Sequence, residues 1–401
     1  MAFFRSLFGE EAAIVHDRDF QVLMLANITP AMGAGLLSPI LDSLIDPFGA
    51  TPASIGLLMS ALTAPAIVMI PLAGLVADRY GRKPILIASL LLFGTAGIGL
   101  ALTTDFQVAL VLRGLQGIAF GGIAPVIITS LGDIYDEATE ATAQGIRFAG
   151  SGTSLTVFPL LAGALVVIAW QLPVLLYGVA IPLAAIVYRW FDEPMTASRS
   201  DSVAANGNGR SQLAALVDLV TRRHVLAMVI ARGFPEGIWI GVLTYNSIVV
   251  VRILGGTPTL AGLLVALGSL TYAIAASQAG RITARFESRL HPLLVANLCL
   301  GIGFGAFVSA PSISFALVGV VIAGVGFGLS LALYRSIITG LAGASMRAGL
   351  VGLAEGTGRV NATLTPIVMG WIIAVGSPQF GFAPAVQLAG VVIAGVGAIG
   401  G

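Results

Sequence analysis

Long apolar segments alternate with short polar ones along almost the whole chain. A helix needs about 20 mostly apolar residues to cross a bilayer, and we find about twelve segments of that length. The predicted spans lie near residues 20–43, 53–77, 84–103, 106–131, 143–168, 171–190, 224–251, 259–281, 291–310, 312–338, 346–375 and 380–401. The pattern predicts an all-α membrane protein with twelve transmembrane helices.

The composition supports this prediction. Of the 401 residues, 57% are hydrophobic and 10% are charged, whereas an average soluble domain has about 25% charged residues. So few charges cannot cover a water-exposed surface, so the surplus apolar side chains are expected to face lipid. The formal net charge of +1 gives no sign of nucleic-acid binding.

The middle of the chain is polar and rich in Gly, Ser and Asn, which predicts a cytoplasmic linker over residues 192–222. The linker would separate an N-terminal six-helix bundle at residues 1–191 from a C-terminal bundle at residues 223–401. Basic residues gather on one side, and the opposite connections hold only Arg252. By the positive-inside rule we expect a multi-pass protein of the cytoplasmic membrane with both termini in the cytoplasm.

Several short patterns recur at a constant offset. Pro159-x3-Gly163 recurs 207 residues later as Pro366-x3-Gly370, Gly117 as Gly324, and Phe120-Gly121 as Phe327-Gly328. One such pair is weak in a chain with 51 glycines, but a constant offset predicts two parallel, related halves.

The sharpest motif joins the second and third spans and runs Gly74-Leu-Val-Ala-Asp78-Arg79-Tyr-Gly81-Arg82-Lys83-Pro84. A glycine at 74 permits close helix contact, and one at 81 permits a tight turn. A proline at 84 suits the first turn of a helix. A basic loop that only sets topology is the alternative interpretation.

This motif resembles the signature loop of the major facilitator superfamily, G-x3-D-R-x-G-R-[KR]-P. The resemblance implies the major facilitator fold, with two pseudo-symmetric six-helix bundles. It also implies that the loop is a latch that holds the halves together in the outward-open state. The latch would comprise Gly74, Asp78, Arg79, Gly81, Arg82 and Lys83, with Asp133 as the expected partner of Arg79.

Arg113-Gly-Leu-Gln116-Gly117 resembles the R-x2-Q-G motif of the same superfamily, where the arginine is linked to proton coupling. An arginine in hydrocarbon is costly unless it faces a polar cavity. Arg113 should therefore point inward and find an acceptor. Snorkelling to the external interface is the alternative.

Two partial matches favour the twelve-helix drug:proton antiporter branch. The fifth span resembles the antiporter motif at Gly145, Pro159 and Gly163, although Phe158 replaces a glycine. The first span resembles that branch's opening motif, with Asp42 in place of its second proline. The alternative is that these glycines and prolines are ordinary helix kinks.

Two pairs of charges lie within predicted spans at helical spacing, Arg232 with Glu236 and Glu355 with Arg359. A carboxylate in a low-dielectric cavity binds a proton more readily than in water, and a nearby arginine reverses this. We hypothesise that Glu236 or Glu355 carries a coupled proton, with Asp42 at the external mouth as a weaker candidate. Alternatively, each pair neutralises itself and serves packing.

Further polar and aromatic residues fall within the spans. We expect the substrate cavity to draw on Asn27, Trp239, Asn246, Tyr272 and Asn361, with Phe148 as a further candidate. Such a mixture would bind amphiphiles through apolar area and a few polar anchors. Any one of them could instead be ordinary packing.

Together these features predict a monomeric secondary active transporter that works by alternating access. We expect proton-coupled efflux of drugs or other small amphiphilic molecules; the alternative is a proton-coupled symporter or facilitator for a sugar, organic acid or other metabolite. The sequence holds no H-E-x2-H, no G-x-S-x-G and no second cysteine. It also lacks G-x4-G-K-[ST], so we expect no enzyme activity, cofactor, metal or ATP.

Overall fold

The computed structural model describes residues 10–193, 217–286 and 288–401. These residues form helices and connecting turns, with no strand among them. Twelve of the helices in this part of the chain are long and apolar enough to cross a membrane, and each overlaps one predicted span. The all-α membrane fold is therefore confirmed. Most of the predicted linker, residues 194–216, lies outside the described residues.

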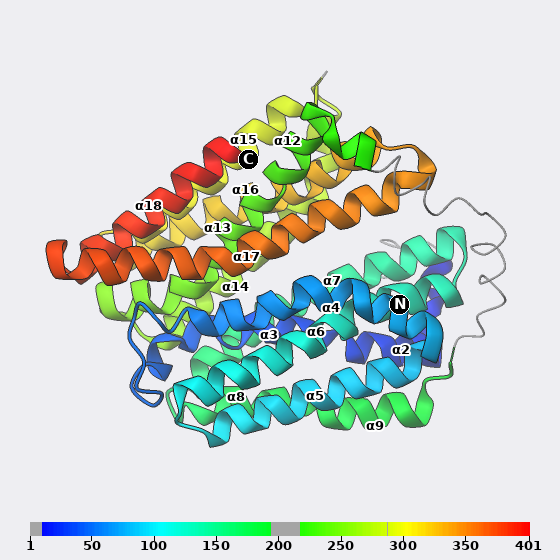
Figure 1. The fold of residues 1–401 in the computed structure, drawn as a ribbon, viewed down its shortest axis with the longest axis horizontal. Coiled ribbons are helices and arrows are strands. Elements are labelled where there is room, and N and C mark those ends of the chain that lie inside the picture. The colour runs from blue at the N-terminus through cyan, green and yellow to red at the C-terminus, as the bar shows by residue number, and fades with distance from the viewer. Residues whose placement is uncertain (1–9, 194–216, 287) are drawn as a thin grey trace.

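The N-terminal half contains the first six spans (Figure 1). A 3₁₀ turn, η1 (Glu10–His16), precedes them. The first span comprises α2 (Arg18–Ala26), α3 (Ile28–Gly35) and η2 (Ser38–Ile40), followed by η3 (Asp42–Leu44). The next four are α4 (Leu57–Tyr80), α5 (Arg82–Leu102), α6 (Phe106–Ile134) and α7 (Glu137–Leu165). The sixth is α8 (Gln171–Leu175), η4 (Leu176–Val179) and α9 (Ala180–Trp190).

The C-terminal half contains the other six. The seventh span comprises α12 (Arg223–Ala231), α13 (Gly233–Ser247) and the π-helical turn η5 (Ile248–Ile253). The remaining five are α14 (Pro258–Thr283), α15 (Leu290–Val308), α16 (Ile313–Leu341), α17 (Ala344–Phe380) and α18 (Phe382–Gly400).

The first and seventh spans break at corresponding places. A proline inside a helix has no N–H for the carbonyl four residues earlier, and its ring clashes with that carbonyl. Pro30 therefore ends α2 at Ala26, and Pro235 ends α12 at Ala231. Both spans continue beyond the break as α3 and α13.

The recurring glycines mark equivalent helix crossings in the two halves. A Cβ added at Gly117 would lie 2.3 Å from the carbonyl oxygen of Leu62, and one at Gly324 would lie 2.5 Å from that of Gly268. A side chain larger than hydrogen cannot fit at either distance. The offset seen in the sequence thus corresponds to the same close contact, between α4 and α6 in one half and between α14 and α16 in the other.

The two halves join at the ends of the bundles opposite Trp190 and Arg223, which flank the linker. We call the joined end of the bundles the distal end, and the end that holds Trp190 and Arg223 the linker end. Ser38 Oγ donates to the carbonyl of Leu243 at 2.6 Å, and Ser60 Oγ donates to that of Thr363 at 2.7 Å. The hydrogen bonds between halves thus run from the distal end to the middle of α17.

The helices separate towards the linker end, and Figure 1 shows the two sets of ribbons diverging there. Gly74 on α4 and Gly352 and Gly356 on α17 lie on this side, and an added Cβ would meet nothing within 4 Å at any of the three. Glycines are therefore in close contact with the opposite half where the halves meet, and have free space around them where the halves separate.

Candidate functional site

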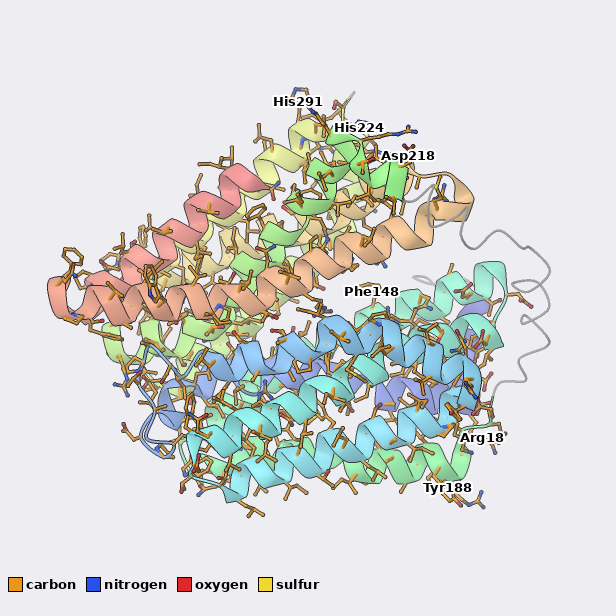
Figure 2. The ribbon with its side chains drawn as sticks, in the orientation of Figure 1. Arg18, Phe148, Tyr188, Asp218, His224 and His291 are labelled. Carbon is orange, nitrogen blue, oxygen red and sulfur yellow. The ribbon has the colours of Figure 1, made fainter. Side chains whose placement is uncertain are left out.

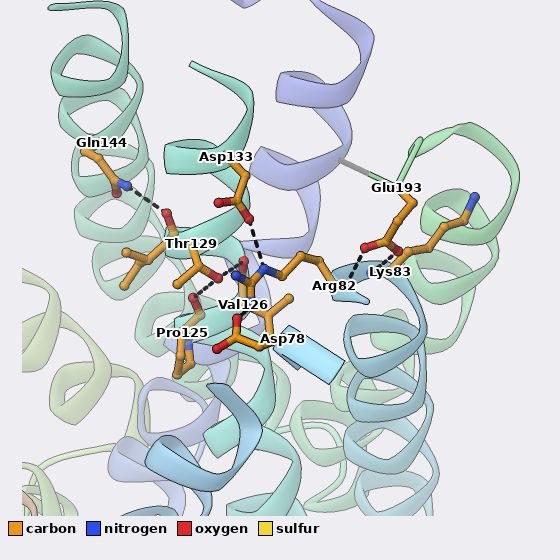
Figure 3. Close-up of polar contacts among 10 residues, drawn as sticks. Asp78, Arg82, Lys83, Pro125, Val126, Thr129, Asp133, Gln144 and Glu193 are labelled. Atoms are coloured by element: carbon orange, nitrogen blue, oxygen red, sulfur yellow. Dashed lines mark hydrogen bonds and ion pairs between the residues drawn. The ribbon is translucent and has the colours of Figure 1, made fainter. Parts of the chain in front are cut away.

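Arg82 is the centre of the signature loop between α4 and α5. Its guanidinium contacts Asp78 at 2.6 Å and Asp133 at 3.0 Å, as Figure 3 shows. Glu193 accepts hydrogen bonds from the backbone N–H groups of Arg82 and Lys83 at 2.5 and 2.9 Å. A carboxylate at this position satisfies two free donors at the start of α5 and complements its dipole.

Gly81 is required at the turn for two reasons. Its φ of +96° lies in a region that favours glycine. An added Cβ would also lie 2.9 Å from the carboxylate of Glu193. The motif's second glycine therefore allows both the turn and the close approach of Glu193.

The predicted pairing of Arg79 with Asp133 is wrong. Asp133 binds Arg82, while Arg79 lies over the Tyr80 ring at 5.6 Å. Glu193 was not among the residues predicted for this loop. An acidic residue just after the sixth span was the available signal, but its distance from the loop along the chain hid the contact.

Arg113 is completely buried and does not snorkel. Its guanidinium donates to the carbonyl oxygens of Leu58 at 3.1 Å and Gly33 at 2.9 Å, to Gln116 Oε1 at 2.7 Å, and to the Tyr177 hydroxyl at 3.3 Å. Arg113 thereby connects four spans of the N-terminal half. Each acceptor is neutral, and Arg113 makes no ion pair with the carboxylates that the structure describes.

Arg232 is the corresponding buried charge of the C-terminal half, with a side chain that is 2% exposed. It lies 3.5 Å from Glu236 on the adjoining helix α13 and 3.0 Å from Glu355 on α17. The Glu236 side chain is 18% exposed and that of Glu355 is 44% exposed. Two partly exposed carboxylates thus share one buried guanidinium.

The expected pairing of Glu355 with Arg359 on the same helix does not form. Glu355 turns to Arg232, and Arg359 crosses to the N-terminal half, where its guanidinium lies 5.3 Å from the Phe120 ring centre. Arg232 offers Glu355 a buried partner, which is worth more than an exposed pair on one helix face.

A second cation–aromatic contact joins the halves nearer the linker end. Arg335 of α16 lies 5.8 Å from the ring centre of Phe148 on α7, and Arg147 lies 4.8 Å from the same ring. Figure 2 shows Phe148 between the two halves. Phe148 was among the predicted cavity candidates but neither arginine was, because a contact between a ring and a cation on distant spans leaves no periodic pattern in the sequence.

Asp42 lies at the distal end and pairs with Arg252 of the opposite half. Its backbone N–H donates to Ser247 Oγ at 3.0 Å, and Asp46 lies 4.0 Å from the same arginine. Burial raises the pKa of Asp42, and the bond to Arg252 opposes that rise. Asp42 therefore belongs to the junction between the halves.

The three residues of the fifth-span motif lie along α7. Gly163 meets the start of α14, where an added Cβ would lie 2.5 Å from the Pro258 carbonyl oxygen. The Pro159 carbonyl oxygen lies 2.3 Å from a Cβ added at Gly262. Gly145 is half-buried nearer the linker end. Two of the three thus lie at the junction of the halves.

The predicted cavity residues have three different kinds of surroundings. Asn27 bonds to Ser151 Oγ at 2.9 Å and Asn246 to the Ala261 carbonyl at 2.9 Å, and both are buried connections between helices. Trp239 stacks on Phe327 at 5.0 Å, with Tyr272 beside them. Asn361 is half-buried and bonds to Thr357 of its own helix.

The arrangement is that of a multi-pass membrane transporter: two six-span bundles, joined at one end, with buried charges between their helices. The family model of the Major Facilitator Superfamily matches residues 23–251 and 237–401. This chain therefore belongs to that superfamily, and it is a transporter rather than an enzyme.

Curated relatives include an exporter, a drug resistance protein and a transporter of an aromatic acid. The Bacillibactin exporter of Bacillus subtilis (strain 168) is 30% identical over 36% of this chain and 38% of its own length. The Quinolone resistance protein NorA of Staphylococcus aureus is 26% identical over 39% of this chain and 40% of its own. The 3-(3-hydroxy-phenyl)propionate transporter of Escherichia coli (strain K12) is 25% identical over 80% of this chain and 79% of its own length. The matches thus span less than half the length of the first two of these relatives.

Solved structures share the fold. A bacterial homologue of the human lysosomal transporter Spinster, inward-facing and occupied, matches with a TM-score of 0.76 and 16% identity over 95% of each chain. A D-xylose-proton symporter matches with a TM-score of 0.73 and 15% identity, over 95% of this chain and 96% of its own. At such low identity these likenesses concern the fold alone.

Proposed function

We propose that this protein is a proton-coupled exporter of small amphiphilic molecules, in which two bundles rock around a central site. The distribution of basic residues favours a cytoplasmic linker end. Among the described residues, the hydrogen bonds and ion pairs between the halves lie between the distal end and the middle of α17, and the contact nearer the linker end is a cation–aromatic one. The conformation described here would therefore be open to the cytoplasm. A relative named as an exporter, another named as a quinolone resistance protein and the partial antiporter motifs support the direction of transport.

The observation that carries the proposal is the group formed by Arg232, Glu236 and Glu355. One ionised carboxylate neutralises the Arg232 guanidinium, so with both carboxylates ionised the group of three carries one net negative charge. Arg232 and Glu355 belong to different spans of the C-terminal half. If the transport cycle includes a helix movement within that half that separates them, Glu355 would be free to take a proton. Proton binding would thus depend on the conformation, which is what coupling requires.

The test is transport in proteoliposomes with an imposed pH gradient and an internal pH-sensitive dye. Tetracycline, a fluoroquinolone and 3-(3-hydroxyphenyl)propionate are suitable probes. We expect probe movement to drive protons in the opposite direction in the wild-type protein, and Glu355→Gln to abolish the proton movement. Asp218→Asn, which removes an exposed carboxylate, is the matched control. Unchanged coupling in both Glu236→Gln and Glu355→Gln would exclude these residues as proton carriers.

Proton-coupled import of a metabolite is the second candidate. The longest of the curated matches described above is to a transporter of 3-(3-hydroxy-phenyl)propionate, over 80% of this chain. The same proteoliposomes separate the two candidates, because a symporter carries probe and proton in the same direction.

A further inference from the structure

We infer that the transported molecule is an organic anion with an aromatic portion, held by Arg359 with Phe120 and by Arg147 and Arg335 with Phe148. This inference rests on the proposed transport function and specifies its substrate class.

The arginines between the halves outnumber the carboxylates that neutralise them. Arg147, Arg335 and Arg359 have no carboxylate within 4.0 Å among the side chains that the structure describes. The two acidic residues of this region, Glu236 and Glu355, are both engaged by Arg232. The face between the halves therefore carries an excess of positive charge.

Arg359 lies at the level where transporter sites are found. Its partner Phe120 lies halfway along α6 (Phe106–Ile134), close to the middle of the bundle. The Arg359 side chain is half-buried, and among the described residues its guanidinium meets the Phe120 ring but no carboxylate. A carboxylate or similar anion would supply the missing partner, with two parallel hydrogen bonds.

The second pair gives the anion a role in the conformational change. Arg147 and Arg335 come from opposite halves, and their like charges approach the same Phe148 ring. Arg147 donates to Gln144 Oε1 at 2.9 Å. This acceptor is neutral, so it does not neutralise the positive charge of Arg147. An anion between the two arginines would replace their repulsion by attraction to both, and would draw the halves together at the linker end.

The rings and the charges also indicate the form of the molecule. Phe148 is 44% exposed, so its ring has surface available for an aromatic or other flat apolar group. A cationic molecule would need a free carboxylate beside open rings. The aromatic cluster near Glu236 does not offer this, because Trp239 is 6% exposed and stacked on Phe327, while Glu236 is held by Arg232.

The test uses three probes of the same shape and different charge: 3-phenylpropionate, 3-phenylpropanamide and 3-phenylpropylammonium. Binding to the purified full chain in detergent is measured by equilibrium dialysis. We expect the anion to bind at least about tenfold more tightly than the neutral and cationic probes, as one charge-assisted hydrogen-bond pair requires. Equal or tighter binding of the amide or the ammonium, or no binding of the anion, overturns the inference.

Variants assign the binding to the named residues. We expect Arg359→Gln to weaken anion binding by about tenfold or more, and Arg359→Lys to restore part of it. The double variant Arg147→Gln/Arg335→Gln should weaken it as well. Arg281→Gln, an exposed arginine at the linker end of α14, is the matched control and should bind as wild type does. Monodispersity and the thermal midpoint of each variant show that it is folded. Unchanged binding in both the Arg359→Gln and the double variant contradicts the inference.

The outcomes separate this inference from the proposed function. Anion-selective binding without proton movement in proteoliposomes would refute proton coupling and leave the substrate class intact. Proton-coupled movement of 3-phenylpropylammonium without anion binding would support the coupling and refute the substrate class.

Discussion

Gly163 and Gly370 occupy equivalent places at the two helix crossings that join the halves. A Cβ added at Gly163 would lie 2.5 Å from the Pro258 carbonyl oxygen, and one added at Gly370 would lie 2.2 Å from that of Ala53. Gly163 lets α7 approach the first residue of α14, and Gly370 lets α17 approach the turn before α4, each in the opposite half. The distal junction is thus built twice from the same repeated motif.

We expect Gly163→Ala and Gly370→Ala to shift the protein away from the distally joined conformation. Overpacking of this kind costs about 1–3 kcal/mol, and that cost falls only on the joined state. Distances between spin labels on the distal loops of the two halves, in a Cys299→Ala background, would report the shift. Gly280→Ala, where an added Cβ meets nothing within 4 Å, is the control. Distance distributions identical to wild type in both variants would contradict this role.

Arg113 should be intolerant of replacement, even by lysine. Its planar guanidinium reaches four neutral acceptors on different spans, and a lysine ammonium cannot match that geometry. We expect Arg113→Gln to lower the free energy of unfolding by about 3 kcal/mol or more, because several buried acceptors lose their donor. Tyr177→Phe, which removes a single bond, should cost about 1 kcal/mol. Thermal unfolding in detergent gives both values, and equal melting of all three proteins would count against this account.

Glu193 should stabilise the signature loop. Its carboxylate accepts from two backbone N–H groups at the start of α5, and removal of such a cap costs about 1 kcal/mol. We expect Glu193→Ala to lower the thermal midpoint measurably. Asp218→Ala is the comparison, because it breaks an exposed ion pair with Arg222 that contributes little. If the two variants melt at the same temperature, Glu193 has no such role.

Asp42 should make the distal junction sensitive to pH. Burial raises the pKa of Asp42 above its ordinary value of 3.8 in the joined state, despite Arg252 and with Asp46 nearby. A raised carboxyl pKa means that the joined state binds the proton more tightly than a hydrated, separated state. Acidification should therefore favour the joined state. This stabilisation of the joined state is complete below pH 3.8 and is lost as the pH rises through the raised pKa of Asp42.

The labelled distal loops would report this pH dependence. In the wild-type protein, the fraction with separated distal ends should fall as the pH is lowered towards 4. Asp42→Asn should show a smaller dependence, and Asp105→Asn, a helix cap at the same end, should match wild type. A pH response that survives unchanged in Asp42→Asn would rule out this carboxyl as its origin.

The spans and their repeat could be read from the sequence because they depend on local patterns. Twenty apolar residues must form a helix in lipid wherever they occur in the chain. The residue types of the signature loop, Gly81 above all, follow from the backbone that such a turn needs.

The partners of the charges were decided only by the tertiary structure. Sequence spacing paired Glu355 with Arg359, but the packing of α17 against α12 and α13 brought Glu355 to Arg232 and left Arg359 to reach Phe120. In the same way, Asp133 met Arg82 instead of Arg79. A side chain in a membrane protein takes the partner that most reduces its cost of burial, and the crossing and rotation of distant helices determine which partner is within reach.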